Sequence, residues 1–139
     1  MFHLDPADRN HARALERLQT DIVLWLTTVS PELAPQPSAV WFWWDSETLL
    51  VYSGGSARIK NIAANPRVAI HFNTDVYGDD ISILYGLAAA DPNAPPAKEV
   101  SGYRERYDQR VSLLGMDWDS FSSHYHLPIR IRLTGYRRW

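Results

Sequence analysis

Cysteine is absent from this chain of 139 residues, and its positive and negative charges nearly balance. Without cysteine the protein has no disulfide framework, no thiolate nucleophile and no Cys-based zinc site. The formal net charge is −2 at pH 7, so there is no excess positive field to hold a nucleic-acid backbone or an anionic membrane. We therefore expect neither a nucleic acid nor a membrane among the partners of this protein.

Long apolar segments are also missing. The two longest runs, residues 22–26 and 39–44, are far shorter than the ~20 apolar residues that a helix needs to cross a bilayer. Residues 1–21 are too densely charged to contain the apolar core of a signal peptide. We therefore expect a soluble, cytoplasmic protein.

Aromatic residues are abundant, with six tryptophans, seven tyrosines and four phenylalanines. Such side chains bury large areas in a core or a subunit interface, and they also suit a flat conjugated ligand. Hydrophobic residues make up 45% of the chain and charged residues 22%, which is the composition of a globular protein. Length and composition together predict one folded domain over residues 1–139.

The spacing of apolar residues and the turn signals predict a mainly β protein with short helices (α+β). We expect six strands, over residues 22–29, 37–44, 48–53, 67–73, 80–90 and 128–139. We expect helices over residues 6–20, 57–64, 97–111 and 117–125, the first of them capped at Asp5-Pro6. The second and third strands should form a hairpin, and Ile129, Ile131 and Leu133 should share one face of the last strand. Such short connections favour a six-stranded antiparallel barrel over a doubly wound parallel sheet.

Residues 53–67 carry the clearest chemical motif. Gly54-Gly55 allow a close backbone approach after a strand, and Ser56 stands where it would cap a short helix. Free N–H groups at the start of a helix favour phosphate, and Arg58 and Lys60 would add two cations. The same spacing is also expected for an ordinary strand–turn–helix connection that binds no phosphate and leaves both cations in solvent. The motif matches neither the P-loop nor the dinucleotide-binding fingerprint.

Other polar groups point less clearly to chemistry. His124 and His126 could lie on one side of an extended segment, but no third ligand is apparent, so we predict no metal site. Tyr103 and Tyr107 belong to an aromatic and basic helix face, which we expect to be solvated.

Four blocks of the sequence, residues 24–29, 35–42, 49–53 and 58–69, resemble the pyridoxamine 5′-phosphate oxidase-like superfamily. The most specific part is Lys60-Asn61-Ile62 followed by Asn65-Pro66-Arg67. Within the superfamily the chain is most similar to the flavin/deazaflavin oxidoreductases of the B group, whose members commonly use coenzyme F420. The resemblance extends over nearly the whole chain.

The resemblance implies a split β-barrel of the FMN-binding-protein type that forms a homodimer with two cofactor sites in grooves at the subunit interface. A strand would run beside the cofactor ring, and the segment from residue 53 to 61 would hold the phosphate and the ribityl chain. The implied cofactor-binding residues are Ser38, Ala39, Val40 and Trp41 on the strand and Ser53, Ser56, Ala57, Arg58, Lys60 and Asn61 on the segment. Among the candidate ring neighbours Trp41, Trp43, Trp44 and Trp139, the resemblance favours Trp41.

The resemblance also implies an F420-dependent oxidoreductase that transfers a hydride from the reduced deazaflavin to a small organic acceptor. Hydride transfer is the chemistry of the cofactor, so no general base is obligatory and we assign no catalytic residue. An FMN-dependent oxidoreductase or electron carrier of the same fold stays open, as does a non-catalytic protein that binds a flavin, a deazaflavin, haem or another tetrapyrrole. The Arg and His residues that hold the substrate phosphate in true pyridoxamine phosphate oxidases have no convincing counterpart here, which disfavours vitamin B6 oxidation.

Overall fold

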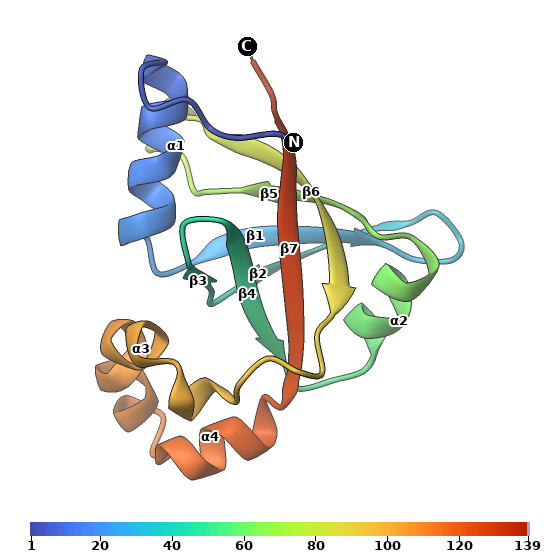
Figure 1. The fold of residues 1–139 in the computed structure, drawn as a ribbon, viewed down its shortest axis with the longest axis vertical. Coiled ribbons are helices and arrows are strands. Elements are labelled where there is room, and N and C mark those ends of the chain that lie inside the picture. The colour runs from blue at the N-terminus through green and yellow to red at the C-terminus, as the bar shows by residue number, and fades with distance from the viewer. Residues whose placement is uncertain (139) are drawn as a thin grey trace.

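The computed structural model describes residues 1–138, which form one curved sheet of seven antiparallel strands in the order β2-β1-β5-β6-β7-β4-β3 (Figure 1). The strands are β1 Leu24–Val29, β2 Pro35–Val40, β3 Trp43–Trp44, β4 Thr48–Ser53, β5 Arg67–His71, β6 Ile83–Ala90 and β7 Leu127–Tyr136. The sheet is a split β-barrel, which confirms the predicted mainly β fold class, although it has seven strands and not six.

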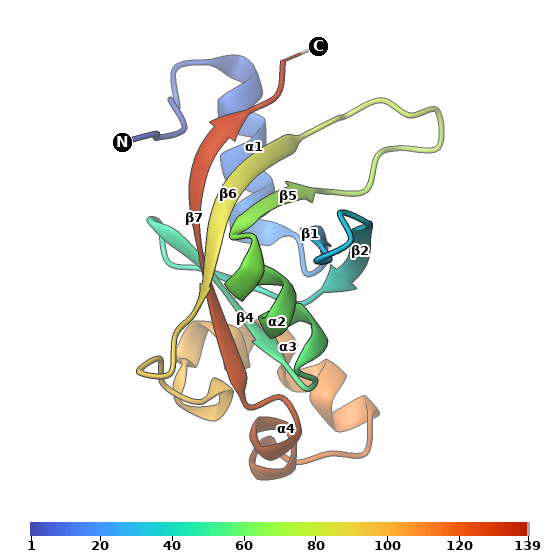
Figure 2. The same ribbon diagram turned by 90° about the vertical axis from the view of Figure 1, so that its right-hand side faces the viewer.

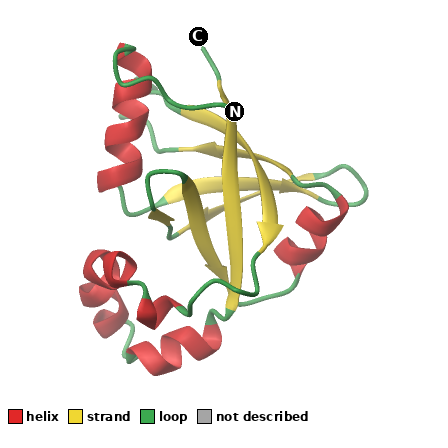
Figure 3. Cartoon of the chain, in the orientation of Figure 1, coloured by secondary structure: helices red, strands yellow, loops and turns green. Residues whose placement is uncertain are grey.

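Short helices lie around this sheet (Figure 3). They are α1 Arg9–Thr20, α2 Ala57–Ala64, α3 Ser101–Leu113 and α4 Trp118–His124, with a 3-10 turn η1 at Ala97–Glu99 before α3. Figure 1 shows α1 at one end of the sheet and the pair α3 and α4 at the other. Figure 2 shows α2 in front of the sheet, where it contacts β1 and β6, and shows the long connection between β5 and β6 projecting to one side. None of the helices in residues 1–138 is both long and apolar enough to span a membrane.

The barrel interior is filled by the alternate residues of the strands. In β7, Ile129, Ile131 and Leu133 are at most 5% exposed, as predicted, because successive side chains of a strand point to opposite faces. Helix α1 closes one end of this core with Ala14 and Leu18, which are fully buried. Burial of a side chain the size of leucine contributes about 1.5–3 kcal/mol, so α1 is held to the sheet mainly by this apolar face.

Helix α1 begins three residues later than Pro6, where the sequence placed its start. Asp8 is the N-cap, and its carboxylate accepts hydrogen bonds from the backbone N–H groups of Asn10 (2.9 Å) and His11 (3.1 Å). Asp5 instead accepts from the N–H of Ala7 in a separate turn. Two aspartates three residues apart offer competing caps, and the second one is used.

The predicted strand over residues 37–44 is interrupted at Phe42. The hydroxyl of Tyr107 accepts a hydrogen bond from the Phe42 N–H (2.9 Å) and donates one to the carbonyl of Ile22 (2.6 Å). A side chain thus takes the place of a neighbouring strand at this point. In consequence β2 pairs with β1, and only Trp43 and Trp44 form the predicted hairpin with β4.

The remaining differences from the predicted elements are small. The first strand begins at Leu24 and not at residue 22, β5 ends at His71 and not at 73, and β6 begins at Ile83 and not at 80. The predicted helix over residues 97–111 is divided into η1 and α3 by the extended residue Val100. The strand predicted over residues 48–53, which is β4, and the helix α2 have the predicted bounds.

A second apolar cluster lies outside the barrel, where α3 and α4 pack on β4. Its buried members are Leu50, Tyr52, Ala97, Tyr103, Tyr107, Val111, Trp118 and Phe121. The predicted solvated face of α3 is therefore wrong for Tyr103 and Tyr107, which are 1% and 0% exposed. Residues four apart lie on the same side of a helix, and here that side faces the sheet. Gly102 permits this contact, because a Cβ atom there would lie 2.1 Å from the indole of Trp43.

Candidate functional site

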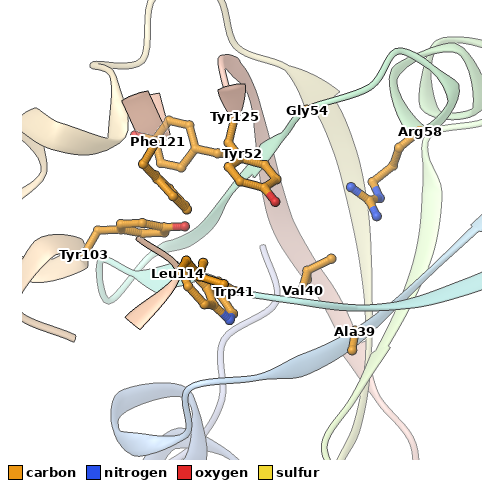
Figure 4. A pocket seen from close by; sticks show the side chains of 10 residues that line it. All are labelled: Ala39, Val40, Trp41, Tyr52, Gly54, Arg58, Tyr103, Leu114, Phe121 and Tyr125. Carbon is orange, nitrogen blue, oxygen red and sulfur yellow. The ribbon is translucent and has the colours of Figure 1, made fainter. Parts of the chain in front are cut away.

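A pocket with a volume of about 210 Å³ lies between the sheet and the two helices of the second cluster. Three elements of the sheet side contribute to it, namely β2, β4 and the start of α2, and α3 and α4 close it from the other side (Figure 4). Its lining residues are Ala39, Val40, Trp41, Tyr52, Gly54, Arg58, Tyr103, Leu114, Phe121 and Tyr125. The predicted ring strand and the predicted phosphate segment thus meet at one pocket.

One end of the pocket is aromatic. The ring of Trp41 stacks on Tyr107 at a centroid distance of 4.6 Å and on Phe121 at 5.6 Å. Tyr103 meets Tyr52 edge to face at 5.3 Å. These contacts hold the rings in fixed positions around the cavity, and rings so arranged form rigid walls for a flat ligand. Trp41 lines the pocket, and its predicted contact with a cofactor ring stays a prediction.

The other side of the pocket holds Arg58, the only cation among its lining residues. The guanidinium of this half-buried side chain donates hydrogen bonds to the hydroxyl of Ser38 (2.8 Å) and to that of Ser53 (3.2 Å). Within residues 1–138 no carboxylate forms an ion pair with it. Burial lowers the pKa of Arg58 below its ordinary value, yet an arginine remains charged at neutral pH. The site therefore contains a positioned positive charge that no carboxylate of residues 1–138 neutralises.

Lys60 does not lie beside Arg58. Residues two apart on a helix point about 200° apart around its axis, because each residue turns the helix by about 100°. Lys60 is exposed and does not line the pocket. Its predicted role in phosphate binding therefore stays a prediction that the geometry of this pocket does not support.

Asn61, the best-matched position of the sequence motif, is 6% exposed. Its side-chain amide donates hydrogen bonds to the hydroxyl of Thr28 (3.0 Å) and to the side-chain carbonyl of Gln36 (2.7 Å). These bonds tie α2 to β1 and β2. Asn61 thus fixes the helix that carries Arg58, and its predicted contact with a cofactor stays a prediction.

The start of α2 is open. Ser56 is its N-cap residue, but the predicted side-chain cap is not formed. Ser56 and Ala57 are both exposed, and the first N–H groups of a helix have no partner within the helix. Gly54 lies close to the end of α4, where a Cβ atom would be 3.1 Å from the carbonyl oxygen of His124. Gly54 therefore allows a close approach to the protein itself, whereas a Cβ atom at Gly55 would have no neighbour within 4 Å.

Trp43 and Trp44, also predicted as ring neighbours, do not line the pocket. Trp44 belongs to the barrel core, Trp43 packs against Gly102, and Trp139 lies outside the described residues. Neither His124 nor His126 lines the pocket. In the described part of the chain no three His, Asp or Glu side chains are grouped to hold a metal ion.

Five pocket residues were not indicated by the sequence, namely Tyr52, Tyr103, Leu114, Phe121 and Tyr125. The four-residue spacing of Tyr103 and Tyr107 signalled a common helix face, but nothing local indicated that this face meets β4. The long-range packing of α3 and α4 alone brings these rings to the pocket.

A seven-stranded split barrel with a cation and an aromatic wall at one end has the fold of flavin-type oxidoreductases. The chain belongs to the pyridoxamine 5′-phosphate oxidase family, whose model matches residues 11–131. This match confirms the superfamily that the sequence blocks indicated. No significant match was found among curated proteins.

Solved structures share this fold. An F420 reductase is similar with a TM-score of 0.66 and 25% identity over 88% of this chain and 94% of that one. A putative pyridoxamine 5′-phosphate oxidase from Listeria innocua has a TM-score of 0.61 and 24% identity over 91% and 94%. The heme storage protein HutZ from Vibrio cholerae has a TM-score of 0.57 and 18% identity over 98% and 94%. The F420 reductase supports the F420-type group within the superfamily.

Proposed function

We propose that this protein is an oxidoreductase that binds coenzyme F420 and passes a hydride from it to a small organic acceptor. The observation that carries the proposal is Arg58, a half-buried cation that two serine hydroxyls hold at the pocket and that has no carboxylate partner among residues 1–138. The similarity to an F420 reductase supports F420 as the cofactor. FMN is the alternative, because its phosphate and ring would use the same features.

The residues present fit such a cofactor. Arg58 and the open start of α2 provide donors for a phosphate, since helix N-termini and guanidinium groups are both common phosphate sites. Ala39, Val40 and Trp41 line the pocket beside them and are suited to border a ring. The order of these groups along the pocket matches a molecule with a phosphate at one end and a conjugated ring at the other.

A second copy of the chain would complete the site. The pocket volume of about 210 Å³ is below the ~300–1,000 Å³ of typical ligand pockets, so one chain does not enclose a whole cofactor. The outer face of the sheet carries apolar side chains that do not belong to the core, among them Trp25, Ile83 and Tyr85, and Tyr85 is 40% exposed. We assign this face to the interface of a homodimer.

In the reaction the chain would bind, orient and shield. When bound in its reduced form, F420 or FMN would supply the hydride. Arg58 would hold the phosphate and so fix the position of the ring, while Trp41 and the rings behind it would keep water away from the reacting face. Reduction of the acceptor by a hydride also requires one proton, which solvent would supply, so we assign no side chain as the proton donor.

Parallel titrations of the purified protein with F420 and FMN, followed by turnover assays with quinone and enone acceptors, test this function. We expect F420 to bind at micromolar or lower concentration and its reduced form to be oxidised only when an acceptor is present. Tight FMN binding without F420 binding would replace the cofactor but keep the class. Binding of haem alone, with neither F420 nor FMN bound, would overturn the proposal.

A further inference from the structure

Tyr103 has a hydroxyl without a partner at the aromatic end of the pocket. The residue is 1% exposed, and its hydroxyl forms no hydrogen bond with any residue of the described chain. Figure 4 shows that the hydroxyl points into the space bordered by Tyr52, Phe121 and Trp41. The hydroxyl oxygen is not fully enclosed, since Ser82 Oγ is the one completely buried side-chain oxygen or nitrogen of the described chain that lacks a partner. The Tyr103 hydroxyl therefore borders the open space of the pocket, where a ligand can bond to it.

Unlike Tyr103, the neighbouring Tyr107 and Tyr52 have hydrogen-bonded hydroxyls. The hydroxyl of Tyr107 bonds to the backbone of Phe42 and Ile22, and that of Tyr52 donates to the carbonyl of Pro95 at 2.6 Å. Both lie in the same cluster as Tyr103. The packing of this region therefore satisfies its buried hydroxyls wherever they face the protein, and Tyr103 is the exception because it faces the pocket.

The chemistry around Tyr103 defines what it can bind. Burial raises the pKa of Tyr103 far above its ordinary value, and the nearby Tyr107 and Tyr52 raise it further, so the hydroxyl stays neutral and can donate. Among the described residues, none that lines the pocket carries a carboxylate. A single neutral donor among aromatic rings does not offset the desolvation of a charged group, so the matching ligand atom is a neutral acceptor on a flat, apolar body.

We propose that Tyr103 donates a hydrogen bond to the ring carbonyl of a neutral, flat conjugated molecule that lies in the aromatic end of the pocket. The choice of a ring ligand rests on the function proposed above. Such a carbonyl can belong to the cofactor ring or to the acceptor, and the hydrogen bond is the same in both cases. A site with such a donor discriminates against analogues that lack the carbonyl, because the hydroxyl would again lack a partner.

The test compares two probes on the wild-type protein and on Tyr103→Phe, both without cofactor. 1-Tetralone carries a carbonyl beside an aromatic ring, and tetralin is the same bicyclic molecule without it. We expect Tyr103→Phe to weaken 1-tetralone binding by about 3–10-fold and to leave tetralin binding unchanged, as followed by tryptophan fluorescence or ligand-observed NMR. A purely structural role of Tyr103 would change both affinities alike, and that result would overturn the proposal. Failure of 1-tetralone to bind the wild type more tightly than tetralin would overturn it as well.

Two further titrations identify the source of the carbonyl. If Tyr103→Phe weakens F420 or FMN binding by a similar factor, the hydroxyl serves the cofactor ring. If cofactor binding is unchanged and the KM for a quinone or enone rises, it serves the acceptor. Neither probe depends on a phosphate site, so the tetralone result can fail or succeed independently of the cofactor assigned through Arg58.

Discussion

The guanidinium of Arg58 donates a hydrogen bond of 2.8 Å to the hydroxyl of Ser38 and so joins α2 to the edge strand β2 at the side of the pocket. Arg58 and Ser38 are 20 residues apart in the sequence. The bond holds a mobile side chain in one orientation before any ligand is present, which reduces the entropy cost of binding.

Replacement of Ser38 by alanine should loosen this orientation without removing the charge. One hydrogen bond contributes about 0.5–1.5 kcal/mol, so we expect Ser38→Ala to weaken F420 or FMN binding by roughly 2–10-fold. Fluorescence titration measures the change. Ser112→Ala, at an exposed position on α3, is the control and should bind as the wild type does. Equal affinities of Ser38→Ala and the control would show that Ser38 does not position the cation.

Tyr107 should contribute more to stability than Tyr103, although both are buried tyrosines of α3. Tyr107→Phe leaves the N–H of Phe42 and the carbonyl of Ile22 without their partner, and an unsatisfied buried group costs about 1–3 kcal/mol. Tyr103→Phe removes a hydroxyl that makes no bond. Urea unfolding should therefore show a clear loss for Tyr107→Phe and none for Tyr103→Phe; losses of equal size would contradict the assignment of these two hydroxyls.

Acid should weaken the contact between the two ends of the chain. A hydrogen bond from Arg138, with those from the N–H groups of His11 and Asn10, lowers the pKa of Asp8 from 3.8 to about 2. The charged carboxylate therefore contributes fully above pH ~3.8, and the contribution declines as the pH falls toward 2. Asp8→Asn keeps a capping side chain but removes the charge. The melting temperature of the wild type should exceed that of Asp8→Asn at pH 7, and the difference should shrink as the pH falls through 2; a difference independent of pH would argue against the ion pair.

The sequence predicted those parts of the fold that are decided locally. The alternation of Ile129, Ile131 and Leu133 with polar residues is sufficient to define β7, and the glycines and Asn65-Pro66 define the bounds of α2. The interruption at Phe42 could not be predicted in this way, because the group responsible, Tyr107, is 65 residues away in sequence. The candidate site likewise has one part that local sequence indicates and one part that depends on long-range packing. Arg58 was found from its motif, whereas the opposite wall comes from helices whose packing no local pattern indicates.

We predict that the protein is a homodimer in solution, so its mass tests the prediction. Light scattering on the purified protein should give twice the mass of one 15.9 kDa chain. Tyr85→Arg places a charge on the outer face of the sheet and should shift the protein toward monomer, since a buried unpaired charge is costly. A wild type that stays monomeric at high micromolar concentration would contradict the interface assigned to this face.

The central claim is that Arg58 binds the phosphate of a flavin-type cofactor, and a matched pair of ligands tests it most directly. FMN and riboflavin share a ring and differ in the phosphate, so they are to be titrated against the wild type, Arg58→Ala and the control Arg110→Ala, which alters an exposed cation on α3. Where F420 is the cofactor that binds, F420 and its ring compound without phosphate take their place. A charge-assisted contact contributes about 1.5–3 kcal/mol, so Arg58→Ala should weaken binding of the phosphate-bearing ligand roughly 10–150-fold and leave the ligand without phosphate unaffected. Equal losses for both ligands, or no loss for either, would contradict the account.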